Sequence, residues 1–129
     1  MGTASVLLDA QVQTKRIYSL LNEVMDLSRQ LAEALDRNDQ VTVQMIISMR
    51  EEPIKRLRAA QSALEEQRNS LDPEEGERLA ALLNGAPAEE PGEEALASQV
   101  ATNRRLLTQV LELDRVLNKK VTREKSIYL

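Results

Sequence analysis

The sequence of 129 residues contains no cysteine, no histidine, no tryptophan and no phenylalanine, and two tyrosines are its only aromatic residues. Without cysteine the chain has no disulfide and no thiolate nucleophile. Without histidine it lacks the commonest general base and the commonest metal ligand. No glycine-rich loop that would cradle a phosphate is present either. We therefore expect a protein that is not an enzyme and that holds no cofactor and no metal.

Two clusters of carboxylates are the remaining candidates for a charged site. Their members are Asp72, Glu74, Glu75 and Glu77 in the first cluster and Glu89, Glu90, Glu93 and Glu94 in the second. Both clusters stand next to predicted helix starts, where free backbone amides stabilise negative charge. Neither cluster has the ligand spacing of a calcium-binding loop. We interpret both as solvated helix caps rather than as a cation site.

Proline and glycine are scarce, with four of each, and they are clustered, so long segments of the chain are uninterrupted. The core must come from leucine, isoleucine, valine, methionine and alanine, a set that favours helices over sheets. Apolar residues recur at steps of three and four, which predicts helices over about 5–36, 40–70, 73–84 and 93–121. Residues 85–92 include two prolines and two glycines, and we expect them to form a mobile linker.

Signals at the helix boundaries support this division. Asp39 is a predicted N-cap for the second helix, and Asp72 followed by Pro73 predicts the start of the third. Pro53 lies inside the second helix, where it removes one backbone hydrogen bond and predicts a kink. The alternative is a complete break, with Pro53 in the first turn of a new helix.

Three long helices and one short helix predict an all-α fold, with residues 1–129 forming a single domain. Short connections make consecutive helices antiparallel neighbours. We expect an elongated antiparallel three-helix bundle, in which a long helical hairpin is joined by a third long helix and the short helix packs at one end.

The charge and the hydropathy pattern suggest where such a protein acts. Seventeen lysines and arginines against 21 aspartates and glutamates give a net charge of −4, which argues against nucleic acid as a partner. No apolar run approaches the roughly 20 residues that span a bilayer, so we expect no stable membrane insertion. The first residues lack the pattern of a signal peptide. These features predict a cytoplasmic protein.

The last predicted helix has more apolar surface than one neighbouring helix would cover, since its apolar residues span roughly 160° of the helical wheel. Two neighbouring helices of the bundle would cover the whole arc. Alternatively, a bound partner covers part of it. Val116 falls outside the arc. Ile127 and Tyr128 follow a basic stretch, and they either contact a partner or dock on the bundle itself.

Three sequence elements resemble the flagellar export chaperones of the FlgN type and the related FliT type. They are the turn at residues 36–39, the stretch Met-Arg-Glu-Glu-Pro-Ile at 49–54 and Asn-Arg-Arg-Leu-Leu at 103–107. The resemblance implies a small cytoplasmic helical protein that binds hook-associated (filament-junction) or filament-cap subunits. By contrast with many family members, which end in a glycine-containing aromatic stretch, this chain ends in Lys-Ser-Ile-Tyr-Leu.

In that family the C-terminal helix is implicated in client binding. Carried over by position, the resemblance assigns this role to Asn103, Leu106, Leu107, Val110, Leu111 and Leu113, and the apolar pattern adds Val116, Ile127 and Tyr128. A client helix would lie with its apolar face in a groove. A homodimer is also conceivable, because the alternative interpretation is a homo-oligomeric coiled-coil or adaptor protein with no role in secretion.

Overall fold

Four helices form most of the computed structural model, which describes the backbone of residues 3–128 and the side chains of residues 5–121. They are α1 (Thr3–Asp36), α2 (Gln40–Asn69), α3 (Pro73–Leu83) and α4 (Glu94–Tyr128). No strand occurs within residues 3–128. The prediction of an all-helical fold is therefore confirmed, and α4 continues beyond its predicted end near residue 121.

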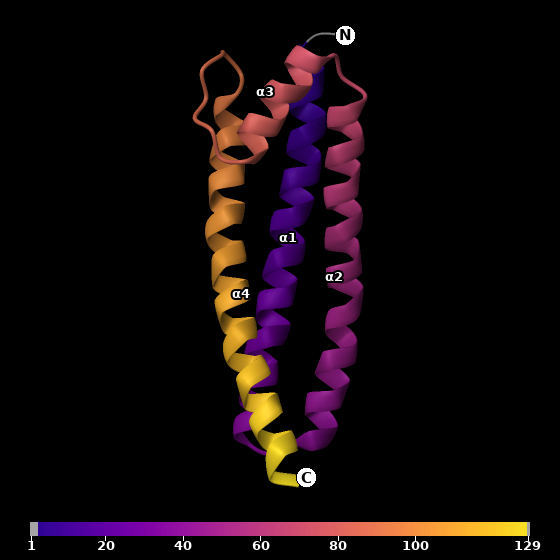
Figure 1. The fold of residues 1–129 in the computed structure, drawn as a ribbon, viewed down its shortest axis with the longest axis vertical. Coiled ribbons are helices and arrows are strands. Elements are labelled where there is room, and N and C mark those ends of the chain that lie inside the picture. Colours follow the sequence, from indigo (N-terminus) through magenta and orange to yellow (C-terminus); the bar gives the residue numbers. More distant parts are fainter. Residues whose placement is uncertain (1–2, 129) are drawn as a thin grey trace.

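The first helix is the centre of the packing. α1 lies between α2 and α4 and contacts both, with α2 running opposite to the other two long helices (Figure 1). Within the described residues no Cα atom of α2 comes within 8 Å of one of α4. The short helix α3 crosses the upper end and contacts both α2 and α4. The two outer long helices are thus linked through α1, through α3 and through side chains.

The turn between α1 and α2 is closed by the predicted cap. The Asp39 carboxylate accepts hydrogen bonds from the Thr42 backbone amide at 3.1 Å and from the Thr42 hydroxyl at 2.6 Å. These two bonds lower the pKa of Asp39 below its ordinary value, and the bond from the Thr42 hydroxyl has the larger effect. Asn38 takes the left-handed conformation with φ 56°, which asparagine tolerates better than most residues. The N-cap prediction is confirmed.

Pro53 lies within one continuous helix. α2 extends unbroken from Gln40 to Asn69, and Pro53 is buried inside it. The alternative of a complete break at this residue is wrong, because the apolar face of α2 continues on both sides of the proline and packs on α1. The kink itself stays a prediction.

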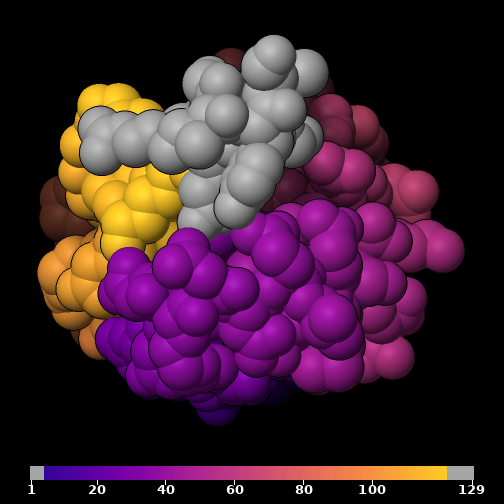
Figure 2. All heavy atoms as spheres, turned by 90° about the horizontal axis from the view of Figure 1, so that it is seen from below, coloured from indigo at the N-terminus to yellow at the C-terminus, as the bar shows by residue number. Residues whose placement is uncertain are grey.

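Three clusters of aliphatic side chains follow one another along the bundle. The upper cluster joins all four helices, because Leu79 and Leu82 of α3 pack against Leu7, Leu64 and Leu96. The middle cluster is the smallest, with Leu21, Val24 and Val110 as its buried members. The lower cluster lies near the turn between α1 and α2, where the atoms of α4 lie beside those of the turn (Figure 2). The core therefore consists of three clusters along the bundle, and the middle one has the fewest buried residues.

Candidate protein-binding groove

A hollow of about 210 Å³ lies between α2 and α4 with α1 as its floor. Most of its lining is aliphatic, and the residues are Thr14, Ile17 and Leu21 of α1, Leu57, Gln61 and Leu64 of α2, Leu83 of α3, and Val100, Asn103, Arg104 and Leu107 of α4. We use the name α2–α4 groove for this hollow together with the gap between α2 and α4 below it, as far as the ion pair between Arg50 and Asp114. All four helices contribute side chains to the hollow.

The groove follows from the way the long helices pack. Both α2 and α4 pack on α1, but their backbones do not approach each other. Side chains alone must fill the gap between them. At the upper end α3 fills it with Leu79 and Leu82, which are 2% and 0% exposed. Below α3 no further helix of the described chain occupies the gap, so Ile17 and Leu57, which line the hollow, are only partly buried.

An ion pair spans the lower end of the groove. Arg50 of α2 donates through Nη2 to Asp114 of α4, and their side chains are 14% and 35% exposed. The Nε atom of Arg50 is buried and makes no hydrogen bond in the structure. An arginine here stands in place of the aliphatic residue that a core position of α2 would otherwise carry, so the ion pair ends the apolar lining of the two walls.

One predicted binding residue is taken up by the fold. The Asn103 side chain is 8% exposed and donates from Nδ2 to the Thr14 carbonyl at 2.8 Å. Its Oδ1 accepts from Gln99 at 3.0 Å. Because it is nearly buried and hydrogen-bonded at both ends of its amide, the Asn103 side chain connects α4 to α1.

The other predicted residues divide into two groups. Val110 is buried, and Leu106 and Leu113 are partly buried against the α1 side of the bundle. The exposed ones are Leu107 at 38%, Leu111 at 58% and Val116 at 37%. Two bundle neighbours therefore account for much of the wide apolar arc of α4, and they leave these three side chains uncovered by the described chain.

The exposed side chains of α4 lie on two faces. Leu107 and Leu111 are one helical turn apart on the side of the groove, and Leu107 lines the hollow. Val116 is nine residues from Leu107, which places it about 180° around the helix. Ile127 and Tyr128 belong to α4, but their side chains lie outside the described residues. The structure thus brings Leu107 and Leu111 together and separates Val116 from them.

A second exposed apolar row went unnoticed in the sequence. Val41, Met45 and Met49 lie at successive turns on the outer side of α2 and are 81%, 55% and 49% exposed. Their spacing of four is the signal that would have found them, since it defines a stripe beside the core face. We call these three residues the α2 stripe.

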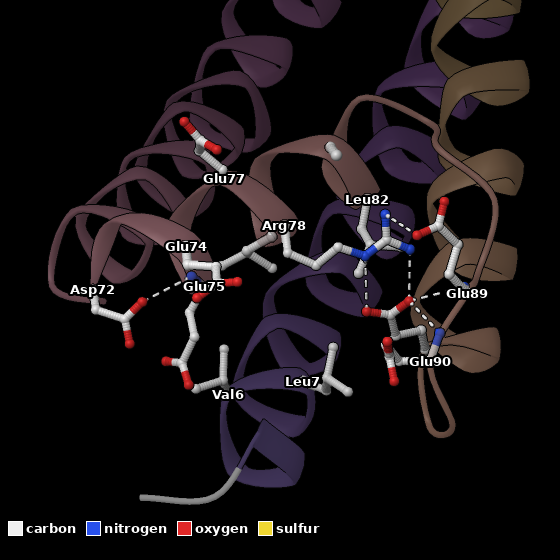
Figure 3. Close-up of a pocket in the computed structure, with 13 residues that line it drawn as sticks. Val6, Leu7, Asp72, Glu74, Glu75, Glu77, Arg78, Leu82, Glu89 and Glu90 are labelled. Atoms are coloured by element: carbon white, nitrogen blue, oxygen red, sulfur yellow. Dashed lines mark hydrogen bonds and ion pairs between the residues drawn. The ribbon is translucent and has the colours of Figure 1, made fainter.

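The two acidic clusters meet around a pocket of about 570 Å³ between α3, the following segment and the start of α1 (Figure 3). Its apolar side is formed by Val6, Leu7 and Leu82. In the figure the Arg78 side chain extends from α3 toward the segment that carries Glu89 and Glu90. Asp72 caps α3 by accepting from the Glu75 amide at 2.9 Å, as predicted.

Glu93 contradicts the interpretation of the acidic clusters as solvated caps. It is 2% exposed, and its carboxylate accepts from Arg78 at 2.6 and 3.0 Å and from the amides of Glu89 and Glu90 at 3.0 Å. The hydrogen bonds from Arg78 are the main reason why the pKa of Glu93 falls to about 2. Sequence spacing could not reveal this pair, because Arg78 lies on α3 and Glu93 lies 15 residues further along the chain, just before α4.

The same cluster holds the segment between α3 and α4. Arg78 also donates to the Pro87 carbonyl at 3.0 Å, and its guanidinium lies 3.6 Å from the Glu89 carboxylate. Together with the Glu93 bonds, these contacts tie residues 85–92 to α3. The sequence-based prediction of a mobile linker at residues 85–92 did not include these contacts with Arg78.

The described residues bear on two further points. No group of three or more carboxylates among them is placed to hold a metal ion. In the same part of the chain, none of the helices combines the length and the apolar character that crossing a membrane requires.

Comparisons with known proteins add nothing to the geometry. No family model, no curated protein and no solved structure matches this chain. The resemblance to the FlgN and FliT chaperones therefore stays a prediction, and the α2–α4 groove is the feature from which a function is best argued.

Proposed function

We propose that this chain is a cytoplasmic export chaperone without enzymatic activity, which binds the helical end of a client protein and prevents its early assembly. By resemblance, the client is a flagellar hook-associated or filament-cap subunit. The proposal also includes the bundle topology expected from the sequence, in which an elongated antiparallel three-helix bundle is the scaffold that holds the client.

One observation carries the proposal, namely the aliphatic hollow between α2 and α4. Helix-in-groove recognition needs apolar contacts along one channel and some exposed anchors beside it. The hollow supplies the channel, and Leu107 and Leu111 extend its apolar surface along α4. Because the hollow is already open, a client helix would bury these side chains without first displacing a helix of the bundle.

Calorimetric titration of hook-associated C-terminal segments into the full chain tests the proposal. Leu107→Asp and Leu111→Asp introduce a charge into the groove, so each should weaken binding about tenfold or more. Val116→Asp is the matched control, since Val116 is as exposed as Leu107 but lies on the other face of α4. Unchanged binding by both groove variants, with circular dichroism confirming that they fold, would contradict the proposal.

The second candidate function, a homo-oligomeric coiled-coil or adaptor protein, is favoured by the α2 stripe. Val41, Met45 and Met49 form an apolar row that the described chain leaves uncovered, as at a dimer interface. Sedimentation of the wild type and of Met45→Asp separates the two functions. A tight dimer that this change dissociates supports the oligomer, whereas a monomer leaves the chaperone as the better proposal.

A further inference from the structure

We infer that the partner of the α2–α4 groove is a short amphipathic helix of another protein, about three turns long, with leucine-like anchors and acidic residues along its flanks. The inference rests on the proposed function and states the chemistry that the groove selects. Three features of the structure carry it: the internal example given by α3, the length of the groove, and the charge of its rims.

The helix α3 shows what fits between α2 and α4. It contacts both helices and fills the upper end of the gap with Leu79, Leu82 and Leu83, at spacings of three and four. Leu83 also lines the hollow beneath. A second helix placed below α3 would meet the same two walls, so its anchors need the same spacing.

The length of the partner follows from the ends of the groove. Gln61 lines the hollow near α3, and Arg50 closes the lower end through its ion pair with Asp114. Eleven residues of α2 separate them, which is roughly 16 Å or about three helical turns. A helix of that length offers two or three apolar anchors to Leu57, Leu107 and the partly buried Ile17.

The charge on the rims selects acidic flanks. Arg58 lies on the groove side of α2, one turn from Ile54 and one turn from Gln61. Its side chain is exposed, and none of the described residues forms an ion pair with it. Arg104 lines the hollow on the opposite wall and donates to the Asn84 carbonyl at 2.8 Å, so its charge is not neutralised by a carboxylate. One positive side chain on each wall of an apolar channel attracts a helix with acidic edges.

The acidic residues on the groove side of α2 lie at a distance from Arg58. Glu51 and Glu65 are each seven residues from Arg58, about two turns in either direction. The central part of the groove is therefore positive, although the whole chain carries a net charge of −4. Because the groove is positive while the whole molecule is negative, we predict negative charge on the flanks of the partner helix.

Fluorescence anisotropy with two labelled helical peptides tests the inference. The peptides share the same leucine anchors, and they differ only in having glutamate or lysine at the flanking positions. The glutamate peptide should bind the full chain about tenfold more tightly, and the preference should shrink to within about twofold in 1 M salt. Arg58→Glu should abolish the preference, whereas Lys55→Glu, an exposed change on the outer side of α2, should leave it intact.

Several outcomes would overturn the inference. Equal binding of both peptides, tighter binding of the lysine peptide, or a preference that survives Arg58→Glu would each do so. A dimer in sedimentation that Leu107→Asp dissociates would also do so, because a second copy would then occupy the groove. If hook-associated segments bind and lose binding in Leu107→Asp while the designed peptides show no charge preference, only the partner chemistry fails. If Leu107→Asp changes no binding at all, the proposed function fails with it.

Discussion

At the scale of single residues, the charged groups of this chain serve the fold in ways that their spacing does not reveal. Glu93 is buried between α3 and the segment that precedes α4, and four donors surround its carboxylate. Burying a carboxylate is costly unless it is paired and hydrogen-bonded. The bonds from Arg78 and from two backbone amides meet that requirement, so Glu93 contributes to stability only while it is ionised.

The pKa of Glu93 gives this contribution a direction with pH. Because the pKa in the folded chain is about 2, below the ordinary value of 4.5, the stability is fully present above about pH 4.5 and is lost as the pH falls toward 2. Glu93→Gln should lower the free energy of unfolding by about 1–3 kcal/mol at pH 7. Urea denaturation followed by circular dichroism should show that the difference from wild type narrows at pH 2.5.

The control for this prediction is Glu90→Gln. Glu90 is exposed, and its hydrogen bonds with Glu93 use only its backbone amide and carbonyl, so this side-chain change should have little effect at either pH. A Glu93→Gln variant as stable as the wild type at pH 7, or a difference that does not depend on pH, would refute the role of the buried pair.

At the scale of the elements, the helix starts are set by side chains that the sequence identifies. Asp39 and Asp72 accept from the free amides of the next turn, as their positions before the apolar repeats predict. Such bonds are local, because donor and acceptor lie three residues apart. This is why the caps could be predicted.

Removal of the first cap should be measurable. Asp39→Ala leaves the Thr42 amide without its acceptor and should cost about 1 kcal/mol. Thermal unfolding followed by circular dichroism should show a lower midpoint than for Glu33→Ala, an exposed change within α1. Equal midpoints would mean that the turn holds α2 without this cap.

The sequence also predicted the number of helices, most of their bounds and the apolar face of each, since these follow from periodicity and local signals. It did not separate Leu107 and Leu111 from Leu106 and Val110, although all four belong to one apolar arc of α4. Which of them is covered depends on where α1 and α2 lie, and that is a long-range property. For the same reason the Arg78–Glu93 pair and the α2 stripe were not predicted.

At the scale of the whole molecule, the open side of the bundle is the central feature. α1 is shared by two long helices that do not contact each other through their backbones, and α3 fills only the upper end of the gap. If nothing fills this gap, several leucines and isoleucines stay partly exposed, and the favourable free energy of burying them is lost. We therefore interpret the gap as the place of a further helix, below α3, that another protein supplies.

Mapping of backbone amide shifts by nuclear magnetic resonance tests this interpretation most directly. A hook-associated C-terminal segment is titrated into the labelled full chain, and shifts are recorded along α1, α2 and α4. The largest changes should fall on both walls of the groove, around Leu57 and Leu107, with little change at Met45 in the α2 stripe. Changes confined to the α2 stripe, with the groove residues unmoved, would contradict the central claim.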